Sequence, residues 1–199
     1  MESIVMIGSG GHALSCLDVI NTTGKFKCVG YVDVTPNESA YWKDLPYLGT
    51  DVDYVRLAKE WKNFFLGVGQ IESSAVREKI VTLVTKAGGV FPLVVSPHAY
   101  VSITAQMGQG TVIMHGAHVG PQAQLGAFNI INTKALIEHG VRTEDFVHVS
   151  TGAVANGDVV IGKSSFIGSN AVIRQSLKIP AQSFIQAGQF ANNSTVGAK

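Results

Sequence analysis

Glycines near the start of the chain have the spacing of a phosphate-binding turn. Gly8-x-Gly10-x-x-Ala13 lies between an apolar stretch and a helix-like stretch, and Asp33 follows about 20 residues later. Glycines let the backbone approach a ligand, and a helix N-terminus presents N–H groups to a phosphate. The spacing alone fits NAD, the diphosphate of a sugar nucleotide, or a purely structural tight turn.

The two cysteines give no sign of a metal site or a disulfide framework. Cys16 and Cys28 lie twelve residues apart, with neither a second pair nor a histidine cluster at ligand spacing. We therefore expect two reduced thiols and no bound metal.

The composition combines few charges with many glycines. Charged residues make up 15% of the 199 residues, against roughly 25% in an average soluble domain. Glycine accounts for 22 residues, and the formal net charge is +1, so a strongly basic nucleic-acid-binding surface is not expected. No apolar run is long enough to span a bilayer, and residues 1–5 do not resemble a secretory signal. We expect a cytoplasmic protein with neither a membrane nor a nucleic acid as partner.

An aliphatic residue returns at every sixth position over the second half of the chain. The series runs through Val101, Met107, Ile113, Val119, Leu125, Ile131, Ile137, Thr143, Val149, Ala155, Ile161, Ile167, Ile173, Ile179 and Ile185. Only Thr143 and Ala155 are not large aliphatics. Alanine or threonine stands two residues before many of these positions, and glycine often follows them. Such a period predicts a solenoid in which each flat face takes one hexapeptide.

Three faces make one coil of 18 residues, so the fifteen hexapeptides predict about five coils. The aliphatic side chains point inward and stack on their equivalents in the neighbouring coils. The glycines are expected to supply backbone freedom at the turns.

The first 97 residues predict a small α/β unit with a parallel sheet. Strands are expected over residues 4–7, 27–33, 63–67 and 90–95. Helices are expected after the glycine turn, ending near Gly24, and over residues 72–87, with Ser73 or Ser74 near the cap. Residues 35–49 contain two prolines and are expected to form a loop.

This combination resembles the PglD/NeuD group of bacterial sugar acetyltransferases, which belong to the hexapeptide-repeat acyltransferases. The resemblance rests on the Gly-Ser-Gly-Gly-His turn, Asp33, the turn at Gly67-Val68-Gly69 and the C-terminal hexapeptides. The sharpest local matches are at residues 131–133, 137–139, 145–148 and 157–162. It implies a Rossmann-like sugar-nucleotide-binding domain at 1–97 and a left-handed parallel β-helix at 98–199, the acetyltransferase domain. The handedness comes from the resemblance.

The resemblance implies transfer of acetyl from acetyl-CoA to a sugar. The leading prediction is N-acetylation of a 4-amino-4,6-dideoxy sugar linked to UDP, dTDP or GDP. O-acetylation of a sugar or sialic acid is the first alternative. A non-catalytic sugar-nucleotide-binding protein is the second.

In this family the histidine matching His139 is the general base, a role that suits an imidazole near neutral pH. Many relatives carry an acidic residue next, where this chain has Gly140. One coil is 18 residues, so Asp158 should lie against Gly140, and we hypothesise that Asp158 supports His139. Glu138 is a weaker candidate for that support.

The same stacking places Gly157 on His139, where its N–H could meet the thioester oxygen or the coenzyme. The resemblance implies acetyl-CoA contacts at His148, Gly157 and Ser169. On the sugar-nucleotide side it implies contacts at Gly10, Gly11, His12, Asp33 and Gly69. Asp33 is expected to contact the base or the ribose, or instead to cap a turn.

The resemblance also implies a homotrimer with active sites between neighbouring subunits. His115 and His118 are expected to be surface or subunit-contact residues. The tail after Gln189 is short and polar, and it lacks the fuller closing segment of many relatives.

Overall fold

The computed structural model describes residues 1–194, which form two compact units. The sheet unit comprises Met1–Gly69 and Ala75–Val94. The β-helix unit comprises Gln70–Ser74 and the chain from Val95 onward. Within residues 1–194, no helix has both the length and the apolar character needed to cross a bilayer.

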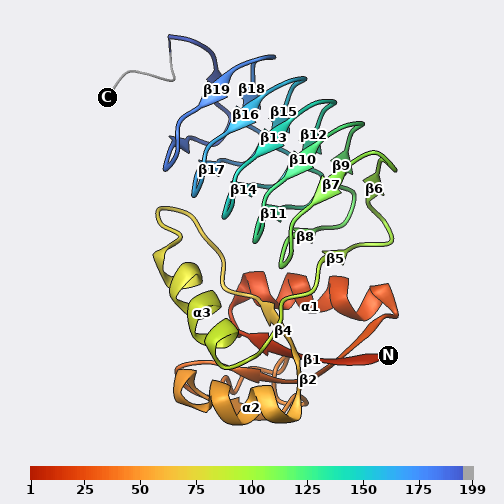
Figure 1. The fold of residues 1–199 in the computed structure, drawn as a ribbon, viewed down its shortest axis with the longest axis vertical. Helices are drawn as coiled ribbons and strands as arrows, with labels where there is room; N and C mark the ends of the chain where they lie inside the picture. The colour runs from red at the N-terminus through yellow and green to blue at the C-terminus, as the bar shows by residue number, and fades with distance from the viewer. Residues whose placement is uncertain (195–199) are drawn as a thin grey trace. The chain divides into compact units, whose positions relative to one another are not determined.

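The sheet unit is a four-stranded parallel sheet in the order β3-β2-β1-β4. Its strands are β1 (Glu2–Ile7), β2 (Phe26–Val32), β3 (Tyr47–Gly49) and β4 (Asn63–Leu66). Its helices are α1 (Gly11–Thr23), the 3-10 turn η1 (Asp51–Asp53), α2 (Tyr54–Glu60) and α3 (Ala75–Lys86). Helices α1 and α2 lie on opposite faces of the sheet (Figure 1). The predicted Rossmann-like parallel sheet is confirmed.

Helix α1 forms because its apolar residues recur on one face, which is buried. Gly10 is its N-cap, in extended conformation, and Gly24 follows it with a φ of 65°. That left-handed conformation costs glycine little, so Gly24 ends the helix where the sequence predicted.

Two predictions for the sheet unit were wrong. Tyr47–Gly49, expected to be loop, is strand β3 paired with β2. Residues 90–95 do not form the fourth strand, because only Val90 bridges to Asn63. Pro92 lacks the N–H that a ladder needs, and the next apolar pair, β5 (Val94–Val95), joins the β-helix instead.

The predicted helix over residues 72–87 is observed as α3, which begins at Ala75. The start is later than predicted because Gln70–Ser74 pack with the β-helix unit.

The β-helix has three parallel sheets, which we call faces 1, 2 and 3 (Figure 1). Face 1 contains β5, β8 (Val112–Ile113), β11 (Ile130–Ile131), β14 (His148–Val149), β17 (Phe166–Ile167) and β20 (Phe184–Ile185). Face 2 contains β6 (Tyr100–Val101), β9 (His118–Val119), β12 (Leu136–Ile137), β15 (Val154–Ala155), β18 (Val172–Ile173) and β21 (Phe190–Ala191). Face 3 contains β7 (Gln106–Met107), β10 (Gln124–Leu125), β13 (Arg142–Thr143), β16 (Val160–Ile161) and β19 (Lys178–Ile179). The β-helix predicted from the hexapeptides is confirmed, and the stacked parallel strands fit the left-handed form that the resemblance implied.

The second residue of each strand points inward and builds the core. Ile131, Ile137, Ile161 and Ile167 are fully buried. The solenoid continues past Gln189 into β21, and how the chain covers the last coil lies outside the described residues.

The glycines of the repeats act differently from the prediction. Five of the glycines that follow aliphatic positions, Gly108, Gly120, Gly126, Gly162 and Gly168, do not have positive φ. A Cβ at each would lie within 3 Å of the backbone of the next coil, so these glycines permit close stacking. The left-handed turn positions are filled by other glycines and by nine non-glycine residues.

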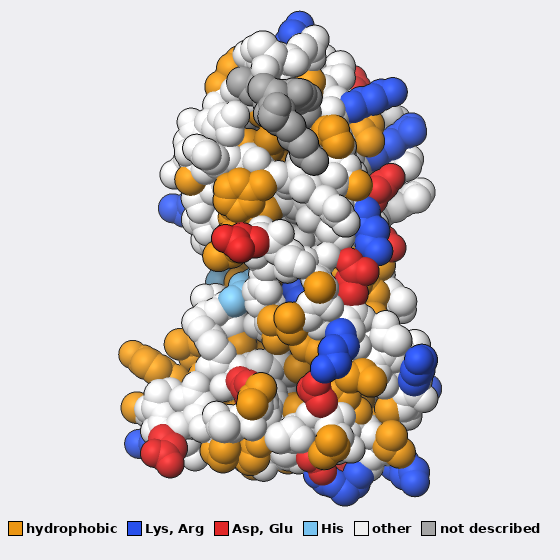
Figure 2. Space-filling model, turned by 90° about the vertical axis from the view of Figure 1, so that its left-hand side faces the viewer, with side chains coloured by type: hydrophobic (Ala, Val, Ile, Leu, Met, Phe, Trp, Pro, Cys, Tyr) orange, Lys and Arg blue, Asp and Glu red, His pale blue; other side chains and the backbone are white. Residues whose placement is uncertain are grey.

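Charged side chains of both signs are interspersed on the face shown in Figure 2, without a continuous basic surface. This distribution agrees with the formal net charge of +1.

Candidate active site

The glycine turn of the sheet unit borders a cavity of about 370 Å³. Its lining residues are Gly8, Ser9, Gly10, Gly11, His12, Asp33, Gly67, Val68 and Gly69. All five residues that the sequence placed on the sugar-nucleotide side therefore line one cavity, at the carboxyl ends of β1, β2 and β4. Ligands of open α/β sheets bind at this end of the strands.

Gly10 and Gly11 border open space. A Cβ added at Gly10 or Gly11 would meet no atom within 4 Å, and neither residue has positive φ. Packing and backbone conformation therefore do not require glycine at either position. No side-chain hydrogen bond caps the N-terminus of α1, so this positive end of the helix suits an anion in the cavity.

The Asp33 carboxylate holds the turn in shape. Its Oδ2 accepts hydrogen bonds from the backbone N and the Oγ of Ser9, at 2.8 and 2.6 Å, and its Oδ1 accepts from Val34 N at 2.7 Å. Asn37 Nδ2 donates to the Ser9 carbonyl at 2.8 Å. These contacts favour the turn-capping role among the two predicted for Asp33.

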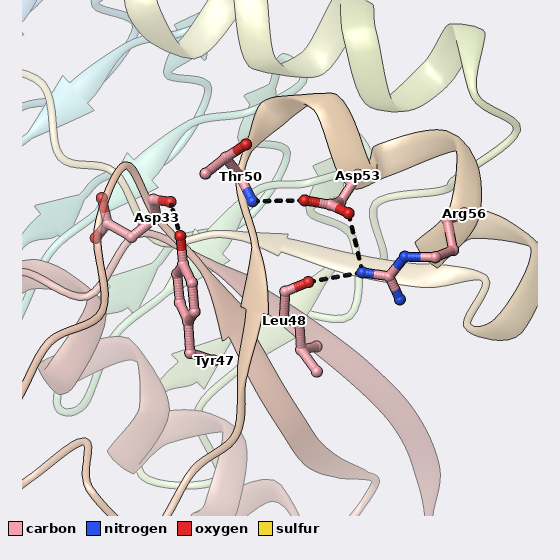
Figure 3. Close-up of polar contacts among 6 residues, drawn as sticks. All are labelled: Asp33, Tyr47, Leu48, Thr50, Asp53 and Arg56. Carbon is pink, nitrogen blue, oxygen red and sulfur yellow. Dashed lines mark hydrogen bonds and ion pairs between the residues drawn. The ribbon is translucent and has the colours of Figure 1, made fainter.

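Strand β3 supports Asp33 from the other side (Figure 3). The Tyr47 hydroxyl donates to the Asp33 carbonyl at 3.2 Å. Beyond the strand, Asp53 accepts from Thr50 N at 2.9 Å and from Arg56 Nη2 at 3.1 Å, while Arg56 also donates to the Leu48 carbonyl. The Thr50 N–H and then Arg56 lower the pKa of Asp53. The ionised Asp53 carboxylate therefore stabilises the fold at pH values above the pKa of Asp53 in the unfolded chain. This stabilisation is lost as the pH falls through the pKa of Asp53 in the folded protein.

A buried thiol lies beneath the cavity. Cys16 Sγ lies 3.4 Å from His12 Nε2. Burial raises the pKa of Cys16 to about 12, although nearby Arg77 opposes the shift. Burial also lowers the pKa of Arg77 to about 10. The thiol is therefore neutral near pH 7 and contacts His12 without acting as a nucleophile.

Gly11→Ala is expected to weaken binding of a diphosphate without weakening the fold. The added methyl group enters the open space of the cavity, and alanine is the better helix former. We expect the Kd of a nucleoside diphosphate sugar to rise about tenfold, or about 1.4 kcal/mol, measured by calorimetry.

The matched control is Gly24→Ala, at the other end of α1, where the φ of 65° strains the new residue. It should lower the unfolding temperature and leave the Kd unchanged. If Gly11→Ala bound the nucleoside diphosphate sugar as tightly as the wild type, the diphosphate would not bind at this turn.

In the β-helix unit, His139 lies on the edge between faces 2 and 3, and its side chain is exposed. Within residues 1–194 its ring makes no hydrogen bond. A Cβ added at Gly157 would lie 2.5 Å from His139 Cε1 and 2.6 Å from Nε2. The ring therefore stacks over Gly157, one coil further on. The Gly157 N–H has no hydrogen-bond partner among the described residues and so remains available.

Asp158 lies against Gly140, as the 18-residue coil predicted. A Cβ at Gly140 would collide with Asp158 Oδ1, so the carboxylate fills the place of the missing side chain. Asp158 N donates to the His139 carbonyl at 3.0 Å. The carboxylate makes no hydrogen bond to the His139 ring in the described part of the chain. Glu138 instead accepts from the His139 backbone N at 3.3 Å.

His148 lies on face 1 and is only 6% exposed. Its Nδ1 lies 2.6 Å from the Gln70 carbonyl, and its Nε2 lies 3.1 Å from Asn132 Nδ2. Ser169 lies on the edge between faces 1 and 2, with its Oγ 3.0 Å from Ser150 Oγ. Within one chain, His148 and Ser169 are therefore not brought together with His139 and Gly157.

The structure adds residues that sequence reasoning missed. Asn132 occurs in a matched motif, but its contact with His148 has no sequence signal apart from the 18-residue coil. Gln70 precedes His148 by 78 residues and has no such signal. Within residues 1–194, no three His, Cys, Asp or Glu side chains come close enough to hold a metal ion.

Two comparisons match part of the chain. Residues 3–84 match the model of the PglD N-terminal domain. A GDP-perosamine N-acetyltransferase from Escherichia coli O157:H7 is 31% identical over 90 residues, which are 45% of this chain and 41% of that protein. The matched stretch thus spans well under half of this relative.

Solved structures cover nearly the whole chain. The acetyltransferase domain of PglB from Neisseria gonorrhoeae FA1090, in complex with acetyl coenzyme A, is 28% identical, with a TM-score of 0.88 over 96% of this chain and 91% of that chain. PerB from Caulobacter crescentus, in complex with CoA and GDP-perosamine, is 24% identical, with a TM-score of 0.87 over 94% of this chain and 87% of that chain. The PerB likeness concerns the fold.

Proposed function

We propose that this protein is an acetyl-CoA-dependent sugar N-acetyltransferase, because residues 3–84 match the PglD N-terminal domain and nearly the whole chain shares its fold with the PglB acetyltransferase domain. Its substrate is the amino group of a nucleotide-linked 4-amino-4,6-dideoxy sugar. GDP is the favoured nucleotide, since a relative that is 31% identical over 90 residues is named GDP-perosamine N-acetyltransferase. We assign sugar-nucleotide binding to residues 1–97 and acetyl transfer to residues 98–199. The observation that carries the proposal is the exposed His139 stacked over Gly157 on this fold.

The reaction needs a base, because the attacking amine must lose a proton. The uncharged amine attacks the thioester carbonyl, a C–N bond forms and the C–S bond breaks. His139 takes the proton from the nitrogen and returns it to the departing CoA sulfur. The unpaired N–H of Gly157 is placed to donate to the thioester oxygen or to the coenzyme.

The sugar nucleotide binds in the cavity of the glycine turn. Gly10, Gly11 and the N-terminus of α1 face the diphosphate. His12 and Gly69 line the same cavity and contact the remainder of the ligand. Asp33 acts through Ser9, because its carboxylate is occupied in holding the turn.

A symmetric oligomer would bring together the residues of the acetyl-transfer site that are separated within one chain. Face 2 carries an outward column of Tyr100, His118, Leu136, Val154, Val172 and Phe190. Most of these side chains are apolar, so we propose that face 2 packs around a threefold axis. The edge with His139 and Gly157 then meets the neighbour's edge with Ser169, and the ring closes after three copies.

In this arrangement acetyl-CoA lies between subunits and contacts Gly157 and Ser169. His148 is almost completely buried, so little of this residue is accessible to the coenzyme. His118 is a subunit contact, and its ring stacks on that of Tyr100 with 4.7 Å between the ring centroids.

The decisive experiment is an assay of CoA release with a panel of nucleotide-linked amino sugars, with the product identified by mass spectrometry. We expect turnover with a GDP-linked 4-amino sugar. Turnover with free sialic acid alone would contradict N-acetylation and would indicate an O-acetyltransferase. Binding of both ligands without turnover on any sugar would indicate a binding protein.

Asp158 is proposed to stabilise the imidazolium that forms at His139. Removing this neighbouring negative charge in Asp158→Asn should move the acidic limb of the pH–rate profile to lower pH and lower kcat about tenfold. An unchanged pH–rate profile would contradict this role.

An exchange of the two positions gives a sharper version of the same test. Gly140→Glu alone should lower activity, because its Cβ collides with Asp158. Gly140→Glu combined with Asp158→Gly removes the collision and restores one carboxylate. The double variant should therefore recover activity that both single variants lose.

A further inference from the structure

The segment Gln70–Ser74, which we call the strap, is fastened to the β-helix at two coils. Gln70 Nε2 donates to the Phe146 carbonyl at 2.8 Å, and the Gln70 carbonyl lies 2.6 Å from His148 Nδ1. Ser74 Oγ donates to Ser164 Oγ at 2.8 Å. Gln70 is only 3% exposed, so both of its polar bonds are shielded from water.

The hydrogen bonds determine which nitrogen of His148 carries the proton. Asn132 Oδ1 accepts from Thr133 N at 2.7 Å, so the amide group of Asn132 faces His148 with its Nδ2. An amide nitrogen is a donor, so His148 Nε2 accepts. The proton is therefore on Nδ1, which donates to the Gln70 carbonyl. The Phe166 ring packs edge to face against the His148 ring, with 5.1 Å between the ring centroids.

The strap begins directly after Gly69, the last lining residue of the glycine-turn cavity along the chain. We propose that His148 is a positioning residue that fixes the strap and, through the peptide bond to Gly69, one wall of the sugar-nucleotide cavity. His148 holds the strap through Nδ1, while its Nε2 is held by Asn132, so both ring nitrogens are engaged, unlike those of the exposed His139.

Amide hydrogen exchange of the full-length protein without ligands tests the strap directly. His148→Phe keeps a buried ring but removes both hydrogen bonds, so the amides of Gln70 and Ser74, the two buried residues of the strap, should exchange about tenfold faster. His148→Asn places an amide donor near the Nδ1 position and should restore most of the protection. His98→Asn, at an exposed histidine, is the matched control and should change nothing. Unchanged exchange at Gln70 and Ser74 in His148→Phe would overturn the proposal.

Steady-state kinetics test the consequence for binding, which rests on the proposed function. In His148→Phe, KM for the sugar nucleotide should rise about fivefold. A rise in KM for acetyl-CoA alone would overturn the positioning role in favour of coenzyme contact. Since the exchange experiment needs no substrate, failure of the proposed function and failure of the strap proposal are distinguishable.

Discussion

His139→Ala is expected to lower kcat by at least about 100-fold, because the attacking amine loses its proton acceptor. The ring is exposed and makes no hydrogen bond within residues 1–194, so its removal leaves no buried group unsatisfied. The unfolding temperature and the Kd of acetyl-CoA should therefore stay close to those of the wild type. Single-turnover kinetics measure the rate of acetyl transfer, titration calorimetry measures the Kd, and scanning calorimetry measures the unfolding temperature.

His98→Ala is the matched control, since His98 is also an exposed histidine of the β-helix unit. It should retain full turnover. If His139→Ala also retained full turnover, His139 could not be the base. If it bound acetyl-CoA much more weakly, the lower rate would reflect binding instead of proton transfer.

Val154→Glu is expected to separate the proposed trimer into monomers and to abolish activity. Val154 lies in the middle of the face 2 column, between Leu136 and Val172. At a threefold axis the substitution would bring three carboxylates together in an apolar contact, which costs several kcal/mol. Analytical ultracentrifugation should show the mass of one chain, and kcat/KM should fall at least about 100-fold.

Val160→Glu provides a control in the same coil on face 3. Its neighbours in the sheet are Arg142 and Lys178, so the new carboxylate meets favourable charges. This variant should remain trimeric and active. A trimer that survives Val154→Glu would show that face 2 is not the interface.

The hexapeptide period predicted most of the β-helix, because one physical requirement repeats along the chain. Each coil must bury an aliphatic residue at the same place, so sequence spacing converts directly into stacking. The same arithmetic correctly placed Asp158 against Gly140 and Gly157 against His139. These pairs were accessible from the sequence because no property other than the coil length determines them.

The sheet unit was harder to predict where local patterns competed. Residues 35–49 hold two prolines and several polar residues and were expected to form a loop, although Tyr47–Gly49 pairs with β2. Residues 90–95 read as a strand because they are apolar, yet Pro92 divides them. In both cases the secondary structure depended on the strand with which the segment could pair. A short stretch of sequence does not reveal that partner strand.

The polar contacts of the site were the least predictable feature. Asp33 carried the expected spacing, but its use by Ser9 depends on the three-dimensional path of the turn. The strap contact of His148 joins residues 78 positions apart without a repeat between them. Residue type identified the candidates, and only geometry distinguished ligand-facing groups from structural ones.

The contact between Gly140 and Asp158 has an evolutionary consequence. Residues one coil apart share nearly the same place in space, so a functional group can be lost from one coil and regained in the next without altering the shape of the site. Two homologous solenoids can then hold equivalent chemistry at positions that a sequence alignment never pairs. Relatives of this chain are better compared column by column than residue by residue.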